Sequence, residues 1–291
     1  MSHGQSSGVG SFARVIQRYY DQTWADYRVL WLNRDNLAFH FGYHEAGTNG
    51  HAEALANTNR VLAERARVRP GSWVLDAGCG VGGSGFWLAR QRGAHVVGIT
   101  LVRSQVRRAR GMAATLRLAA QVQFLQGDYT ATPFDGASFD AVWALESLCH
   151  AADKAAFYRE AARVLRPGGR LVVAEYMRAA RPLEAAGEQT VRQWLDGWAI
   201  PDLNTPTEHV DDATAAGLVD AQVENFTAPT RPSLRRLYRT AYFTYPLAWT
   251  ARTLRLRSAV QHGNVVAALR QYQALERGLW QYGILSATKP G

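Results

Sequence analysis

The residues best suited to chemistry lie in a glycine-rich stretch that follows a short apolar segment. Asp76 precedes a series of closely spaced glycines, Gly78, Gly80, Gly82 and Gly83. Glycine permits positive φ angles and lets a ligand approach the backbone closely. Read as Gly78, Gly80 and Gly83, the stretch matches the dinucleotide-binding fingerprint, although several nucleotide-like cofactors use the same kind of loop. The spacing therefore predicts a nucleotide-like cofactor and leaves its identity open.

The acidic residues around this loop separate the candidate cofactors. An NAD site needs an acid about 20 residues beyond the glycines to hold the ribose diol, yet no Asp or Glu occurs between Asp76 and Asp128. Arg103 suits the 2′-phosphate of NADP, so that alternative survives this comparison. However, no Tyr stands four residues before a Lys, the arrangement that would serve a reductase, since His150 occupies that position before Lys154. NADP-dependent reduction is therefore the weaker interpretation.

The two acids themselves favour a cofactor without phosphate. Asp76 would repel a pyrophosphate but suits an ammonium group, because opposite charges attract at short range. Asp128 follows a predicted strand and is placed to accept a hydrogen bond from an exocyclic adenine amine. S-adenosylmethionine carries both groups. We therefore expect this cofactor, with S-adenosylhomocysteine as its product.

Three stretches together resemble the class I S-adenosylmethionine-dependent methyltransferases. They are residues 76–82, 126–128 and 157–169, and the resemblance extends over about residues 55–178. It implies a Rossmann-like sheet of seven mostly parallel strands whose last strand is antiparallel. The residues expected at the cofactor are Asp76, Gly78, Gly80, Gly82, Thr100, Leu101, Gln105, Asp128 and Tyr129.

A finer resemblance points to one branch of that family. Residues 98–105, 146–151, 19–21 and 40–42 are similar to the sterol and tocopherol C-methyltransferases. In that branch Gln105 would approach the cofactor ribose, and Tyr20 would touch the methyl region. The branch's full lid pattern is absent, so the substrate is not carried over.

The elements that position these residues alternate between short apolar runs and helical patterns. Continuous apolar strands separated by helices indicate an α/β fold, with a parallel sheet covered on both faces. We expect strands near 74–76, 96–101, 122–125, 139–145, 171–176, 221–227 and 282–288. We expect helices near 12–32, 51–67, 86–92, 105–119, 154–165 and 208–217, and a linker that contains Trp194 and Trp198.

Four parts follow from this pattern. Residues 1–54 form a helical cover over the active site, and residues 55–227 form the cofactor-binding core. Residues 228–280 form a basic helical lid inserted before the closing strand, 281–291. An insertion at this point of an open sheet is able to fold over the strand ends.

The residues expected to act on the methyl acceptor are Glu146, His150 and Tyr20. Glu146 and His150 stand four residues apart, just past the predicted strand 139–145, at the edge where α/β sheets bind ligands. A carboxylate and an imidazole are able either to remove a proton or to stabilise a carbocation. The acceptor atom therefore stays open between carbon and oxygen or nitrogen.

Charge bears on the substrate. The chain carries a net charge of +9, and the lid holds nine arginines against one acid, Glu276. The arginines are Arg231, Arg235, Arg236, Arg239, Arg252, Arg255, Arg257, Arg270 and Arg277. A concentrated positive field favours an anionic partner. The excess lies in one insertion rather than along a groove, which disfavours nucleic acid and RNA methylation. A cofactor-binding protein without catalysis is a further, weaker alternative.

Two substrate classes are expected, both small molecules, with methylation on carbon as the main prediction and methylation on oxygen or nitrogen as the alternative. The first is an isoprenoid-like compound methylated on carbon, whose anionic head group, such as a diphosphate, is held by the lid arginines and brings Mg²⁺. The second is an aromatic or polyketide natural product methylated on oxygen or nitrogen, with His150 as base. Lid residues 238–249 also suggest peripheral contact with an anionic membrane.

Composition excludes several other classes. The chain of 291 residues is 47% hydrophobic and 20% charged, which excludes a disordered protein. No run of eighteen apolar residues and no signal-peptide pattern occur in the sequence. Cys79 and Cys149 lack metal-ligand spacing and are expected as reduced thiols in a cytoplasmic protein. No metal site is expected apart from one that a diphosphate would bring.

Overall fold

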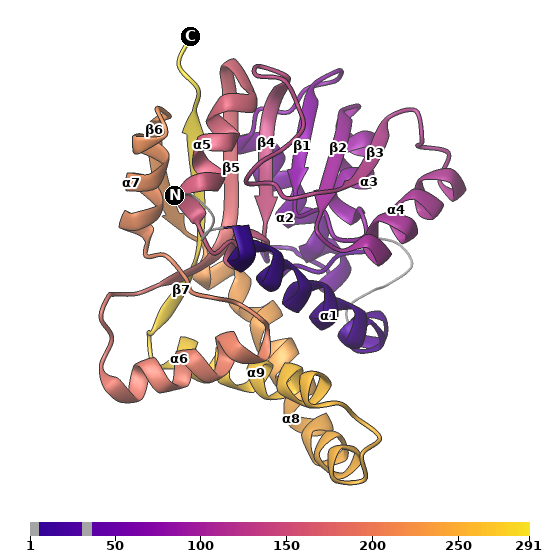
Figure 1. Cartoon of the computed structure of the whole chain (residues 1–291), viewed down its shortest axis with the longest axis vertical. Coiled ribbons are helices and arrows are strands. Elements are labelled where there is room, and N and C mark those ends of the chain that lie inside the picture. Colours follow the sequence, from indigo (N-terminus) through magenta and orange to yellow (C-terminus); the bar gives the residue numbers. More distant parts are fainter. Residues whose placement is uncertain (1–5, 31–36) are drawn as a thin grey trace.

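The chain folds into a seven-stranded sheet with helices on both faces (Figure 1). The computed structural model describes residues 6–30 and 37–291, so residues 1–5 and 31–36 of the predicted cover lie outside the described residues. The elements in chain order are α1 (Ser6–Leu30), α2 (His51–Arg65), β1 (Trp73–Ala77), α3 (Gly83–Arg92), β2 (His95–Thr100), α4 (Arg103–Thr115), β3 (Val122–Gln126), β4 (Phe139–Leu145), the 3₁₀ helix η1 (Leu148–His150), α5 (Lys154–Val164), β5 (Leu165–Arg178), α6 (Ala185–Gly197), α7 (Pro206–Ala215), β6 (Val219–Asn225), α8 (Thr227–Thr253), α9 (Ala259–Glu276) and β7 (Trp280–Thr288).

The strand order explains where a ligand can bind. The strands lie in the order β3-β2-β1-β4-β5-β7-β6. Strands β1 to β5 pair in parallel, whereas β7 is antiparallel to both β5 and β6. The predicted fold class, with its antiparallel last strand, is thereby confirmed. The order reverses between β1 and β4, and open α/β sheets bind ligands at the carboxyl ends of the strands at such a point.

Strands β1, β2, β4 and β5 bury side chains on both faces of the sheet. Val74 belongs to a cluster with α2, α3 and α4, whereas Leu75 belongs to a cluster with α5 and α7. The same alternation recurs in β4, where Trp143 and Val142 lie in different clusters. Successive side chains of a strand point to opposite faces. Asp76 therefore shares its face with Val74, on the side that the covering helices reach.

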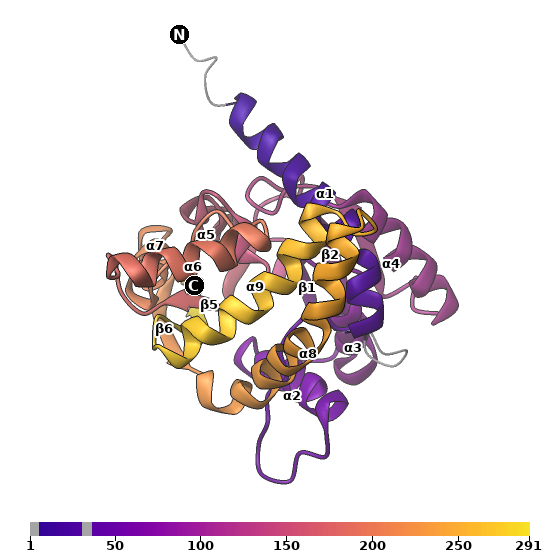
Figure 2. The same cartoon turned by 90° about the horizontal axis from the view of Figure 1, so that it is seen from below.

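Helices α1, α6, α8 and α9 lie along one edge of the sheet (Figure 1), and α9 crosses beneath it between α6 and α8 (Figure 2). The prediction of a linker around Trp194 is wrong, because residues 185–197 form α6. Trp194 is fully buried against Tyr176 and Trp280. A Cβ at Gly197 would lie 2.5 Å from the carbonyl oxygen of Gly263 in α9. Helix α6 thus forms through close tertiary packing.

Local signals explain where some of the later helices begin. Thr205 and Glu208 form a reciprocal capping box at the start of α7, and Ser258 and Gln261 form one at the start of α9. Such boxes satisfy backbone N–H groups that have no partner within the helix. None of the described helices has the length and apolar character needed to cross a membrane.

Candidate active site

A large cavity opens at the carboxyl edge of the sheet, beneath α1, α8 and α9. It encloses about 1430 Å³, counting the part open to solvent. Ten of the twelve predicted site residues line it, namely Tyr20, Asp76, Gly78, Gly80, Thr100, Leu101, Gln105, Tyr129, Glu146 and His150.

The loop after β1 passes close to the end of β4. Gly78 has a φ of +88°, and a Cβ there would lie 2.2 Å from the Cβ of Ser147. A side chain at this position would force the two strand ends apart. The N–H groups of Gly78 and Cys79 donate to the carbonyl oxygen of Ile99 at 2.9 and 3.1 Å. These contacts fix the loop between β2 and β4.

Asp76 presents a carboxylate oxygen that nothing in the described chain satisfies. The residue is 3% exposed, and its Oδ2 atom has no hydrogen-bond partner among the described residues. Burial raises the pKa of Asp76 to about 7. An unpaired buried polar atom is costly unless a bound group supplies a donor. The site therefore suits a ligand that brings a cationic or hydrogen-bond-donating group to Asp76.

Two predicted cofactor residues do not line the cavity. A Cβ at Gly82 would lie 2.5 Å from the ring of Phe124, so this glycine makes room for core packing. Asp128 accepts hydrogen bonds from the N–H and hydroxyl of Thr130, at 2.8 and 2.7 Å, and thereby closes a local turn. The neighbouring Tyr129 does line the cavity. A cofactor role for Gly82 and Asp128 stays a prediction.

The end of β2 joins the cofactor side of the cavity to α1. The hydroxyl of Thr100 donates to Oε1 of Gln105 at 2.8 Å, and both residues are buried. The carbonyl oxygen of Leu101 accepts a hydrogen bond from Nε2 of Gln17 in α1 at 3.0 Å. The covering helix is therefore tied to the residues expected at the cofactor ribose.

Glu146 follows β4 and is engaged by three donors. Its Oε1 accepts from the N–H of Phe41 at 2.7 Å and from the hydroxyl of Tyr282 at 2.8 Å. Its Oε2 accepts from the hydroxyl of Tyr176. Burial raises the pKa of Glu146 to about 8, although these hydrogen bonds act in the opposite direction. The carboxyl group thus ties two strands and the loop before α2 to one point of the cavity.

His150 presents one ring nitrogen to the cavity in a defined protonation state. Its Nδ1 lies 3.1 Å from the carbonyl oxygen of Ala199, which only accepts, so Nδ1 carries the proton. Burial lowers the pKa of His150 to about 4, so the ring is neutral. Nε2 therefore holds a lone pair and accepts from the hydroxyl of Tyr20 at 3.0 Å. The structure thus brings two predicted catalytic residues into one hydrogen-bonded pair.

The carbonyl that orients His150 belongs to residues 198–204, which connect α6 to α7 and are called the wall segment below. Trp198 and Ile200 of this segment line the cavity. The segment is irregular, and Ala199 has a φ of +53°. Its course must therefore be held by contacts outside itself.

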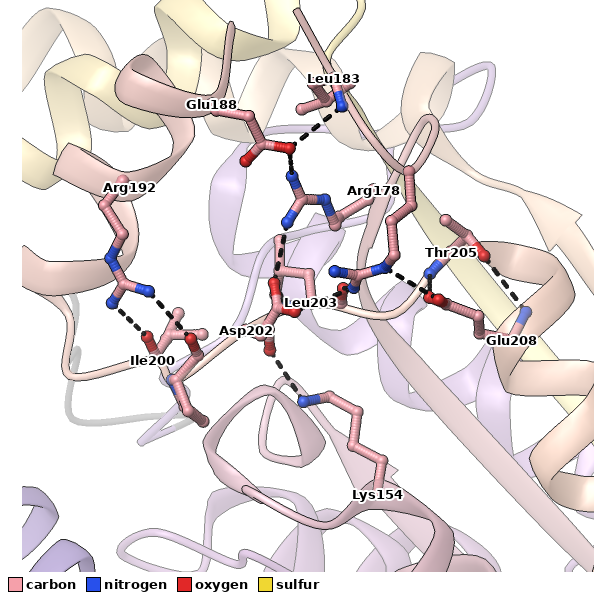
Figure 3. A network of polar contacts seen from close by, with 12 residues as sticks. Lys154, Arg178, Leu183, Glu188, Arg192, Ile200, Asp202, Leu203, Thr205 and Glu208 are labelled. Atoms are coloured by element: carbon pink, nitrogen blue, oxygen red, sulfur yellow. Dashed lines mark hydrogen bonds and ion pairs between the residues drawn. The ribbon is translucent and has the colours of Figure 1, made fainter. Parts of the chain in front are cut away.

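A network of charged side chains holds the wall segment (Figure 3). Lys154 donates through Nζ to the carbonyl oxygen of Asp202 at 2.8 Å. Arg178 is buried and pairs with both Glu188 and Asp202, the latter at 3.0 Å. Arg181 also contacts Asp202, at 2.9 Å. Several directional bonds therefore converge on one residue three positions after Ala199.

The lid arginines lie outside the cavity. None of the nine lines it, and the described part of its lining contains neither Arg nor Lys. Arg257 pairs with Asp26 of α1 at 2.7 Å, and Arg231 pairs with Glu276 at 2.5 Å. The lid residues at the cavity are Leu237, Ala241, Thr244, Asn264, Val265 and Ala268. An anionic head group would therefore lack the partners expected for it.

Several residues at the site were not predicted. Tyr176 and Tyr282 bond to Glu146 from distant strands, and the sequence offered no signal for them beyond the need of a buried carboxyl for donors. His40 lines the cavity with Nδ1 beside the carbonyl oxygen of Phe41, while its Nε2 has no partner among the described residues. Within the described chain, no group of three His, Cys, Asp or Glu side chains is arranged for a metal ion.

Comparison with known proteins decides the family. A family model described as "Methyltransferase domain" matches residues 75–173. Methyltransferase GfsG of Streptomyces halstedii is 34% identical over 238 residues, which cover 80% of this chain and 82% of that protein. The chain belongs to the S-adenosylmethionine-dependent methyltransferases.

Two further relatives of this methyltransferase have names that state their substrates. The 27-O-demethylrifamycin SV methyltransferase of Amycolatopsis mediterranei is 34% identical and covers 78% of this chain and 77% of its own. The tocopherol O-methyltransferase of Arabidopsis thaliana is 29% identical, with 98% and 84% covered.

Solved structures share the fold over nearly the whole methyltransferase. The [4+2]-cyclase SpnF superposes with a TM-score of 0.79 at 24% identity, and the match covers 96% of both chains. Geranyl diphosphate C-methyltransferase from Streptomyces coelicolor A3(2), in complex with Mg²⁺, geranyl diphosphate and S-adenosylhomocysteine, gives 0.71 at 22% identity over 96% and 97% of the two chains. These likenesses show a common fold.

The residues present fit the methyltransferase's cofactor, S-adenosylmethionine. The unsatisfied Oδ2 of Asp76 suits the ammonium of its amino-acid portion, because it is buried and without a partner in the described chain. Gly78, Cys79 and Gly80 of the loop beside Asp76 line the cavity. Thr100, Gln105 and Tyr129 line the same cavity from the next strand ends.

Proposed function

We propose that this methyltransferase methylates a hydroxyl oxygen of a hydrophobic, aromatic or polyketide-type natural product. The observation that carries this proposal is the neutral His150, whose Nδ1–H faces Ala199 and whose Nε2 lone pair faces the cavity. An oxygen acceptor needs a base within hydrogen-bond reach of its proton. The lack of Arg and Lys in the described lining, and the relatives named for natural-product substrates, support the same class.

The chemistry divides between cofactor and protein. S-adenosylmethionine, when bound, supplies an electrophilic methyl group and leaves as a neutral thioether. His150 takes the proton of the acceptor hydroxyl on Nε2 as the new carbon–oxygen bond forms. Tyr20, which donates to the same nitrogen in this structure, yields its place to that hydroxyl. The protein's remaining task is to align the acceptor and exclude water.

The lowered pKa of His150 is compatible with this role. Burial penalises the imidazolium, which lowers the pKa to about 4. With the cofactor bound, its sulfonium would already bring a positive charge into the cavity, and methyl transfer would remove that charge as the ring of His150 gains a proton. The cavity would hold one positive charge before and after the step, so protonation of His150 would add no further charge to be desolvated.

Methylation on carbon is the second candidate. Aromatic residues of the lining, including Tyr27, Tyr176 and Trp198, offer ring faces that attract a carbocation. Glu146 would then stabilise the cation or remove its proton. Glu146 would take part in this step while its carboxyl group accepts hydrogen bonds from Phe41, Tyr176 and Tyr282. For an acceptor of this kind His150 would be dispensable.

The two candidates are separated by substrate and by variant. We expect turnover of a phenol or polyketide alcohol but not of a prenyl diphosphate, measured by S-adenosylhomocysteine release. His150→Gln should lower kcat on the alcohol by roughly 10²–10⁴-fold and leave cofactor affinity unchanged by calorimetry. Turnover of the prenyl diphosphate that needs Glu146 and tolerates His150→Gln would overturn the proposal in favour of C-methylation.

A further inference from the structure

Large apolar side chains crowd the outer side of the lid near the end of α8. The tip patch comprises Tyr242, Phe243, Leu247, Trp249, Leu254 and Leu256. Each exposes 53–77% of its surface. Six of the nine exposed large hydrophobic residues of the described chain fall within these fifteen positions. Single exposed apolar residues are ordinary, but such a concentration marks an interaction site.

Helix α8 has two distinct faces at this point. Leu237, Ala241 and Thr244 face the cavity, whereas Phe243 and Leu247, at helical spacing of four, face outward. Figure 1 shows the end of α8 protruding at the edge of the molecule away from the sheet. The tip patch is therefore accessible to a flat partner.

The charge around the tip patch is positive and uncompensated. Arg239, Arg252 and Arg255 are exposed, and their side chains make no hydrogen bond or ion pair with the described residues. No Asp or Glu occurs between Glu224 and Glu276. The partner must therefore combine an apolar layer with negative charge.

We propose that the tip patch docks the enzyme onto an anionic lipid surface. Aromatic and aliphatic side chains enter the boundary between head groups and acyl chains, while arginines remain at the phosphates. A second copy of the chain is a poorer occupant. A twofold contact through this patch would place the same arginines opposite one another without any acid. The proposal does not depend on which acceptor the enzyme methylates.

Vesicle sedimentation of the 291-residue chain tests this inference. We expect binding to phosphatidylcholine vesicles that contain about 30% phosphatidylglycerol and weak binding to phosphatidylcholine alone. Raising the salt from about 0.1 M to about 0.5 M should weaken the binding, since exposed charges are screened. The triple variant Arg239→Gln, Arg252→Gln, Arg255→Gln should lower partitioning about 100-fold. Phe243→Ser with Leu247→Ser should lower it on both vesicle types.

Matched control variants show whether vesicle binding depends on the tip patch or on the overall charge and hydrophobicity of the protein surface. Arg69→Gln, Arg90→Gln and Arg107→Gln remove three exposed arginines elsewhere, and Val219→Ser removes an exposed valine from β6. We expect them to bind anionic vesicles within about twofold of the wild type, apart from a small loss from net charge. The inference fails if the wild type does not sediment, or if the patch variants bind as it does. It fails also if light scattering shows a dimer that Phe243→Ser and Leu247→Ser convert to monomer.

Discussion

The wall segment and helix α8 border the same cavity, but different forces hold them. Charged hydrogen bonds from Lys154, Arg178 and Arg181 converge on the wall segment. The cavity face of α8 instead packs through small or apolar side chains such as Leu237 and Ala241. Hydrogen bonds are directional, whereas hydrophobic packing is not. The directional bonds thus hold the segment whose carbonyl orients His150, and the less directional contacts lie on the lid side of the cavity.

The largest expected effect comes from breaking the wall network. Arg178→Leu should lower the free energy of unfolding by roughly 2–4 kcal/mol, because a buried cation that bonds two carboxylates is lost. Urea unfolding measures this. Arg159→Leu removes an exposed arginine paired with Asp153 and should cost at most about 1 kcal/mol. Equal losses in both variants would contradict the role given to the network.

The pH dependence of stability should differ between a buried histidine, His209 in α7, and a partly buried one in the lid, His262. Burial lowers the pKa of His209, which contacts Tyr158 behind the wall segment, to about 3. As the pH falls, His209 binds a proton in the unfolded chain before it does so in the folded protein. The contribution of the neutral His209 to the free energy of unfolding is therefore complete above about pH 6.5 and is lost as the pH falls below that value. Between pH 8 and pH 5, His209 by itself should lower the free energy of unfolding by about 2 kcal/mol.

Urea unfolding of His209→Gln at both pH values isolates this contribution, because the variant should lose that much less than the wild type. His262→Gln in the lid is the control, since His262 is only partly buried, and its pH profile should stay close to that of the wild type. A wild-type profile in His209→Gln would show that His209 does not carry the effect.

A smaller effect is expected where α1 meets the lid. Asp26 pairs with Arg257 and accepts from Asn264, and Asn264 accepts from Tyr19 of α1. Asp26→Asn should cost about 1 kcal/mol. It should also speed hydrogen exchange in the first turns of α9 without changing that of the wall segment. Exposed Glu276→Gln is the matched control. Faster exchange in the wall segment would show that the two regions are coupled.

The smallest effect is expected on the outer face of α8. Phe243→Ser with Leu247→Ser should change the free energy of unfolding by no more than about 0.5 kcal/mol, because both side chains are already in water. Thermal and urea unfolding measure this. Leu237→Ala on the cavity side should cost at least about 2 kcal/mol. A large loss in the double variant would mean that the tip patch stabilises the fold itself.

The core of the site was predictable because its signals are local. The apolar runs before Asp76 and before Glu146 predict strands, and the glycines between Asp76 and α3 predict a tight ligand-binding turn. Parallel strands then bring their carboxyl ends to one edge whatever the rest of the chain does. At Asp128 the local signal gives the position after β3, while one carboxylate oxygen accepts from Thr130, so its role at the cofactor stays a prediction.

The partners of the catalytic candidates were not predictable. Tyr176 and Tyr282 reach Glu146 from strands 30 and 136 residues later. Ala199 meets His150 through a backbone carbonyl, for which no side chain gives a signal. Helix α6 was missed because Trp194 reads as an isolated aromatic until Tyr176 of β5 and Trp280 of β7 supply the surface that buries it.

By itself, the sequence determined the parallel sheet, the glycine turn with its acid, and the positions of Glu146 and His150 along the chain. These depend on hydrophobic periodicity and backbone stereochemistry, which act over a few residues. Only the tertiary structure decided which nitrogen of His150 carries the proton, which donors surround Glu146, and that the lid arginines do not line the cavity. Those outcomes depend on burial and on contacts between distant segments, and neither is present until the chain has folded.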